Sequence, residues 1–214
     1  MKNFSVAMAL VDYLPVLLFA AAAVLLQRDL YNKMSKGAFA LFAAGTIDVF
    51  FAGALKATYK LLYAAGVCDF EPLTQMFFPV QAIGFMLAGL GVVAMLCHPQ
   101  KNTLHGVALA AAPQVYRGTM LFVALMVLGL LGMDAGFALL ARRLKKPAAA
   151  VFFGLSFVFS LAMGYLSSKD FSAAYMNWIA QGVNIIGQGA LLCGAVLLHR
   201  AGLARLSLEK EARA

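Results

Sequence analysis

Four side-chain amides recur along an apolar segment near the end of the chain: Asn177, Gln181, Asn184 and Gln188. Successive spacings of four, three and four residues place them on one narrow face of a helix. Amides donate and accept hydrogen bonds, and such a stripe would be unfavourable against lipid. We therefore expect Gln181, Asn184 and Gln188 to line a hydrated cavity suited to a neutral, hydroxyl-rich or amide-bearing solute. The alternative is that they hydrogen-bond to neighbouring helices and hold them together.

A carboxylate lies in the middle of another apolar segment, at Asp48 in "GTIDVFF". Lys56 and Tyr59 follow it at helical spacings that place them roughly on its side. Together with Gln81 and the amides, these three residues form the predicted ligand-binding set. Asp48 could bind a cation, a proton or a polar substrate, and we expect Asp48→Asn to alter coupling. Alternatively, Asp48 pairs with an amide on a neighbouring helix and Lys56 extends to the membrane surface.

Asp134 is the second candidate for ion or proton coupling, in the segment "GLLGMDAGFALL". Gly129, Gly132 and Gly136 flank it at spacings that form a small-residue face, against which another helix can pack closely. The alternative role for Asp134 is pairing with the basic cluster at 142–146 near the membrane surface.

Motifs for enzymatic chemistry are missing from the sequence. It contains no HExxH, GxSxG or phosphate-binding loop, and its three cysteines have no metal-site spacing. We expect no cofactor, no metal and no catalytic residues. An intramembrane enzyme acting on lipid is the weaker alternative.

The elements that must position these residues are membrane helices. The chain has 214 residues, of which 63% are hydrophobic and only 12% are charged. Apolar runs near the roughly 20 residues needed to span a bilayer cover 5–26, 37–55, 76–97, 119–141, 147–166 and 178–198. We predict an all-α integral membrane protein with six or seven transmembrane helices. The net charge of +8 is concentrated in short loops between spans, which excludes a nucleic-acid partner.

An internal repeat is indicated by three matches in the same order. "VQAIG" at 80–84 matches "VNIIG" at 183–187, "KGAFALF" at 36–42 matches "KPAAAVF" at 146–152, and "LLQRDL" at 25–30 matches "LLARRL" at 139–144. We therefore predict a first three-helix repeat at 1–97, a linker at 98–118, a second repeat at 119–199 and a cytoplasmic tail at 200–214.

Charge in the loops predicts the topology. The first loop of each repeat is basic, with Arg28, Lys33 and Lys36 in one and Arg142, Arg143, Lys145 and Lys146 in the other. Both loops should be cytoplasmic, but six spans would place them on opposite sides. A seventh crossing within 103–118 resolves this, although an interfacial or re-entrant helix is the alternative. We expect the protein in the cytoplasmic (plasma or inner) membrane. Its amino terminus should lie outside the cell and its carboxyl terminus in the cytoplasm.

This 3+1+3 arrangement resembles the plan of SWEET-type and other PQ-loop transporters. The resemblance covers helix number and repeat order, whereas the pairs Pro99-Gln100 and Pro113-Gln114 do not occupy equivalent positions in the two repeats. An inverted 3+3 plan is the competing architecture. We expect a transporter of a small solute, or a transporter subunit, with a polar cavity between the repeats. A membrane sensor or accessory subunit that binds a small ligand or partner helices is the alternative, and a homo-oligomer or a partner subunit fits either.

Overall fold

The computed structural model describes residues 5–97, 119–166 and 174–206, and the regular structure within these ranges is helical. Its helices are α1 (Val6–Val11), α2 (Tyr13–Leu30), α3 (Lys36–Ala64), α4 (Pro72–Gln75), α5 (Phe77–Cys97), α6 (Thr119–Arg143), α7 (Pro147–Leu166), α8 (Ala174–Arg200) and a 3₁₀ turn at Leu203–Arg205. The predicted linker at 98–118 and the predicted tail beyond residue 206 lie outside the described residues.

Six helical spans in the described ranges are long and apolar enough to cross a membrane, with α1 and α2 counted as one and α4 and α5 as another. Large apolar side chains point outward from the bundle, among them Leu17, Phe51, Val158 and Ile186, which are each more than half exposed. These features are consistent with the predicted integral membrane protein.

The first span is interrupted at Asp12, between the end of α1 and the start of α2. Pro15 explains the break, because it cannot donate a hydrogen bond to the carbonyl of Val11 and its ring crowds that turn. The interruption places the Asp12 carboxylate at the junction of the two helices, which becomes important for the site below.

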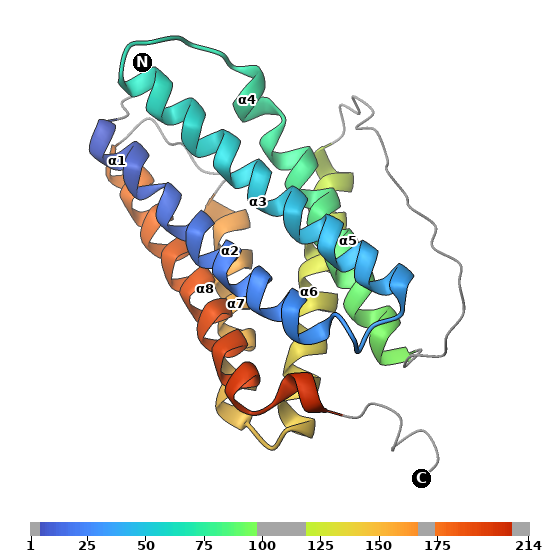
Figure 1. Ribbon diagram of the computed structural model, residues 1–214. Helices are drawn as coiled ribbons and strands as arrows, with labels where there is room; N and C mark the ends of the chain where they lie inside the picture. The colour runs from blue at the N-terminus through green and yellow to red at the C-terminus, as the bar shows by residue number, and fades with distance from the viewer. Residues whose placement is uncertain (1–4, 98–118, 167–173, 207–214) are drawn as a thin grey trace.

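The spans form a closed ring in which each packs against the next: α2, α3, α5, α6, α7, α8 and α2 again (Figure 1). The loop between α2 and α3, the loop between α6 and α7 and the carboxyl end of α8 share one end of this ring, where Arg28 contacts His199. We call this the basic end. As predicted from their charge, the two basic loops lie on the same side of the bundle.

Helices α5 and α6 run parallel, although they are consecutive spans of the described chain. Their contacts keep the same order along both helices: Phe85 packs against Gly129, Gly89 against Gly132 and Val92 against Gly136. Cys97, at the end of α5, therefore lies at the basic end, whereas Thr119, at the start of α6, lies at the opposite end.

Glycines allow the close packing in this half of the ring. A Cβ atom at Gly45 on α3 would collide with the backbone of Gly84 and Ala88 on α5, and one at Gly129 would collide with the backbone of Phe85. The predicted close approach at the glycine face of α6 is confirmed, and the helix that packs there is α5.

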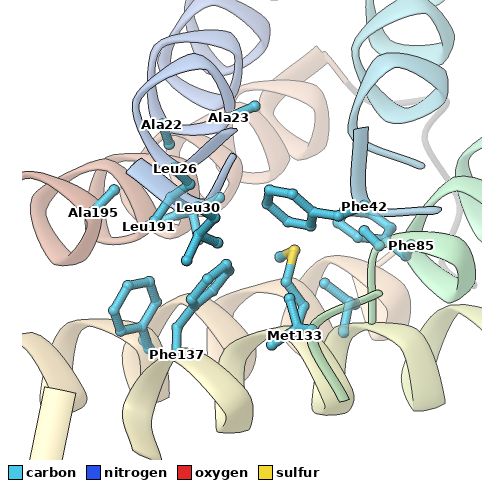
Figure 2. Close-up of a cluster of buried hydrophobic side chains, with 14 of the residues drawn as sticks. Ala22, Ala23, Leu26, Leu30, Phe42, Phe85, Met133, Phe137, Leu191 and Ala195 are labelled. Atoms are coloured by element: carbon cyan, nitrogen blue, oxygen red, sulfur yellow. The ribbon is translucent and has the colours of Figure 1, made fainter. Parts of the chain in front are cut away.

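The centre of the bundle on the side of the basic end is filled by an apolar plug, which we define as Leu26, Leu30, Phe42, Met133, Phe137 and Leu191. Figure 2 shows these side chains converging from α2, α3, α6 and α8. Each is at most 3% exposed, and the rings of Phe42 and Phe137 meet edge to face at 5.9 Å. All six side chains of the plug are apolar.

Candidate functional site

A central cavity of about 380 Å³ lies between the spans, in the half of the bundle away from the basic end. Its walls come from α2, α3, α5, α6, α7 and α8, and its floor, at Phe19, Phe85 and Leu130, adjoins the apolar plug. The volume falls within the range of about 300–1,000 Å³ seen for small-molecule sites. Its polar lining residues are Asp12, Lys56, Tyr59, Lys60, Thr74, Gln81, Ser160, Asn177, Gln181, Asn184 and Gln188.

Three side-chain amides face the cavity without a hydrogen bond to any described residue: Gln81 on α5, and Asn184 and Gln188 on α8. For Gln188 the carbonyl oxygen is fully buried and unpartnered. A buried amide that forms no protein hydrogen bond is unfavourable unless water or a ligand satisfies it. Gln81, Asn184 and Gln188 are thus free to hydrogen-bond to water or to a ligand in the cavity, and they form no hydrogen bond between helices of the described chain.

Gln181 hydrogen-bonds to a neighbouring span, which is the alternative role expected for the amides. Its Nε2 donates to the backbone carbonyl of Met8 at 2.8 Å and to Oδ1 of Asp12 at 2.7 Å. The side chain is 4% exposed, so it joins the last helix of the bundle to the junction of α1 and α2. All four amides of the stripe line the cavity, but Gln181 is bonded to a neighbouring span, whereas Asn184 and Gln188 form no hydrogen bond within the described chain.

Asp12 carries the negative charge of the cavity wall and is compensated. Its Oδ2 lies 2.5 Å from Nζ of Lys60 on α3, and both side chains are about 15% exposed or less. Asp12 is not among the residues that the sequence assigned to the site. The signal that could have identified it was Pro15, because a proline-induced break brings a polar residue inward at a defined point.

Lys56 contributes a second cation to the same wall, one helical turn from Lys60. Its ammonium group lies 3.8 Å from the centroid of the Phe77 ring, a cation–π contact. It forms no ion pair or hydrogen bond within the described chain. Lys56 thus lies inside the bundle and does not extend to the membrane surface, which was the alternative.

Tyr59, also predicted for the site, lines the cavity, and its hydroxyl donates to Oδ1 of Asp69 at 2.7 Å.

Aromatic side chains form much of the remaining wall. Phe19 and Phe85 meet edge to face with centroids 6.1 Å apart, and Phe50, Phe77 and Phe78 also line the cavity. The site therefore combines a polar side with a broad apolar side, a combination typical of pockets that bind organic solutes.

Asp48, by contrast, does not line the cavity. The cavity face of α3 is the stripe Val49, Gly53, Lys56 and Lys60. A spacing of eight residues turns a helix by about 80°, which is enough to move Asp48 off this face. Its Cβ instead lies beside Gly84 on α5, and it has no hydrogen bond or ion pair among the described residues. The sequence grouped Asp48 with Gln81 and the α8 amides, but the structure does not bring Asp48 into the cavity with them.

Asp134 is separate from the cavity and is buried, with 2% of its surface exposed. Neither carboxyl oxygen has a hydrogen bond of acceptable geometry in the described chain, although Ser156 on α7 is close enough to interact with it. It does not pair with the basic cluster at 142–146. Asp134 lies one helical turn beyond Leu130 of the cavity floor, between the cavity and the basic end.

A further polar cluster at the basic end was not anticipated from the sequence. Nδ1 of His199 on α8 lies 2.8 Å from Oδ2 of Asp29 on α2, and Asp29 is 4% exposed. Arg28 lies beside both residues. The cluster joins the two helices that close the ring, and His199 and Asp29 are 170 positions apart in sequence, so no local pattern could have revealed their contact.

No group of three or more potential metal ligands occurs within the described ranges. No protein-family model matches the chain, and comparisons with curated proteins and with solved structures likewise found no match. The functional assignment therefore depends on the cavity itself.

Proposed function

We propose that the protein is a small-solute transporter, or the solute-binding subunit of one, with the central cavity as its substrate site. The observation that carries this proposal is the set of three unpaired amides, Gln81, Asn184 and Gln188, which face one cavity from two different spans. The apolar plug separates this cavity from the basic end. We propose that the cavity opens at the end opposite the basic end, because alternating access requires a site open to one side and closed toward the other in one of its states.

The predicted tandem repeat is part of this proposal and has support in the packing. A Cβ at Gly84 would meet Val49, and a Cβ at Gly187 would meet Phe159. The sequence matches relate Gly84 to Gly187 and, independently, Val49 to Phe159, so equivalent residues form equivalent contacts. We propose a parallel repeat, with the first repeat in α1–α5 and the second in α6–α8, because α2, α3 and α5 have the same directions as α6, α7 and α8.

We propose seven crossings, with the amino terminus outside because the basic end should face the cytoplasm. Because α5 and α6 run parallel, the chain between Cys97 and Thr119 has to join opposite ends of the bundle. Reporter fusions after residue 101 and after residue 118 should therefore lie on opposite sides of the membrane. Reporters on the same side would exclude a seventh crossing.

Asp134 is the coupling residue that we propose, in place of Asp48. A buried carboxylate with only the Ser156 hydroxyl near it, and no ion pair within the described chain, would be strongly unfavourable when ionised, so we expect it to bind a proton or a cation during the transport cycle. Its position between the cavity floor and the basic end suits a group whose occupancy controls movement of the apolar plug.

Cysteine labelling tests the cavity. In a background without Cys68, Cys97 and Cys193, we expect Gln81→Cys, Asn184→Cys and Gln188→Cys to react with a polar, membrane-impermeant thiol reagent. Ile179→Cys and Ile186→Cys provide the matched controls, because these side chains face outward, with 47% and 53% of their surface exposed, and should meet lipid. Equal inertness of both sets would show that the amides form a dry packing seam.

Flux distinguishes transport from sensing. A sensor would use the same cavity to bind a ligand without moving it. Purified protein in proteoliposomes should accumulate or exchange a solute that protects the cavity cysteines. Protection without any flux would favour the sensor or accessory subunit, and would contradict autonomous transport.

A further inference from the structure

The charge of the cavity wall differs from the neutral, amide-lined site that the sequence predicted. Its lining contains three charged residues, two lysines and one aspartate. Lys60 forms the ion pair with Asp12, and Gln181 also donates to that carboxylate. One positive charge, on Lys56, therefore remains in excess among the lining residues.

Lys56 is positioned to bind a ligand more than to stabilise the fold. The face of the Phe77 ring stabilises a cation, but it provides no negative charge and no hydrogen-bond acceptor oxygen. Lys60 and Asp12 both lie near enough to act on this ammonium group, Lys60 by repulsion and Asp12, which is already paired with Lys60, by attraction. An anionic group placed at Lys56 would relieve this repulsion and would form a charge-assisted hydrogen bond.

The remaining lining defines the rest of the ligand. The carboxamides of Gln81, Asn184 and Gln188 provide donors to a second oxygen of an anion or to a polar substituent. The opposite wall, which includes Phe19, Phe50 and Phe85, is apolar and suits an aliphatic or aromatic body. The volume of about 380 Å³ limits this body to the size of a small metabolite.

Building on the solute-binding role proposed for the cavity, we propose that its ligand is a small organic anion with an apolar body, whose carboxylate is held by Lys56. The same chemistry occurs in soluble monocarboxylates and in anionic lipids, and the test below separates these two sources.

The test uses Ser160→Cys, a nearly isosteric reporter in the cavity wall, in the background without native cysteines. The protein is placed in phosphatidylcholine nanodiscs, and protection from a polar thiol reagent is measured with hexanoate, benzoate, hexanamide and benzamide. We expect a carboxylate to protect at a concentration at least about tenfold lower than its amide, the usual range for a hydrogen bond to a charged group.

Variants at position 56 assign this preference to one side chain. Lys56→Met should remove the preference for the carboxylate, and Lys56→Arg should retain it, with a monodisperse elution profile showing that each variant is folded. Lys36→Met is the matched control, because Lys36 is exposed at the basic end and its loss should leave protection unchanged.

The outcomes are distinguishable. Equal protection by carboxylates and amides, or unchanged selectivity in Lys56→Met, would overturn the anion assignment while the cavity itself stands. Protection only in nanodiscs that contain phosphatidylglycerol would support the anionic site and identify lipid as its ligand. Failure of Ser160→Cys to react in any condition would contradict the proposed function as well, because the cavity would not admit solute.

Discussion

The side-chain amide of Gln181 donates a hydrogen bond of 2.7 Å to the carboxylate of Asp12, across 169 positions of sequence. Together with the Asp12–Lys60 ion pair, this bond connects α8, the α1–α2 junction and α3. Three spans from both halves of the chain thus meet at one carboxylate in the cavity wall.

Gln181→Leu should therefore destabilise the bundle. The substitution leaves Oδ1 of the half-buried Asp12 without this donor, which costs about 1–3 kcal/mol. The measurement is the free energy of unfolding in a denaturing-detergent titration. Gln81→Leu is the matched control, because Gln81 makes no hydrogen bond within the described chain and the same change there should not lower the unfolding free energy. Equal losses at the two positions would contradict the connecting role of Gln181.

Gly129→Ala should separate α5 from α6. The added methyl group would overlap backbone atoms of Phe85 and Met86, which cannot move as a flexible side chain would. We expect a loss of at least about 1–3 kcal/mol, as for overpacking in a protein core, measured in the same titration.

Gly154→Ala controls for helix propensity in that experiment. A Cβ at Gly154 has nothing within 4 Å, so alanine there should be neutral or stabilising by up to about 1 kcal/mol. If Gly129→Ala were as well tolerated as Gly154→Ala, the close glycine contact between α5 and α6 would be wrong.

The sequence predicted the spans well because their apolar runs are long, but it ended the second span too early. Residue 55 closes the apolar run, whereas α3 continues to Ala64. The helix continues because Lys56 and Lys60 turn into the cavity, where the Phe77 ring lies against Lys56 and Asp12 pairs with Lys60. Hydropathy measures a residue's preference for lipid and cannot register a partner from another helix.

The spacing of residues in the sequence could not determine how α3 is rotated about its own axis, and so could not show whether Asp48 faces the cavity. This helix is apolar on most of its surface, so no polar face marks which side points inward. Packing decides it, because Gly45 must lie against α5, and Asp48, three residues later, then lies on the same flank. The α8 amides were placed correctly relative to one another because four of them define a face without reference to any neighbour.

Phe137→Ala should weaken the apolar plug. Phe137 is fully buried and contacts the rings of Phe42 and Phe153 at 5.9 and 5.3 Å. Removing the ring should cost about 3–5 kcal/mol of stability. It should also allow a polar thiol reagent to reach Ala195→Cys, a plug-adjacent position that is 0% exposed in the native protein.

Leu139→Ala is the control for Phe137→Ala, since Leu139 lies on the same helix with 49% of its surface exposed. We expect it to leave both stability and the labelling of Ala195→Cys nearly unchanged. If Ala195→Cys reacted equally fast with Phe137 intact, the plug would not be the barrier between cavity and basic end.

Asp134→Asn should separate substrate binding from energy coupling. Asparagine keeps the shape of the side chain but cannot bind and release a proton. Accumulation driven by an ion gradient should therefore fall to background, while exchange of substrate across the proteoliposome membrane continues.

Asp48→Asn is the matched control, because that carboxylate lies outside the cavity beside Gly84, and it should retain both activities. The reverse result, with coupling lost in Asp48→Asn and retained in Asp134→Asn, would return the coupling role to the mid-span carboxylate and contradict our assignment. Loss of both exchange and accumulation in a folded Asp134→Asn protein would instead show that this carboxyl group is needed for the movement of the helices themselves.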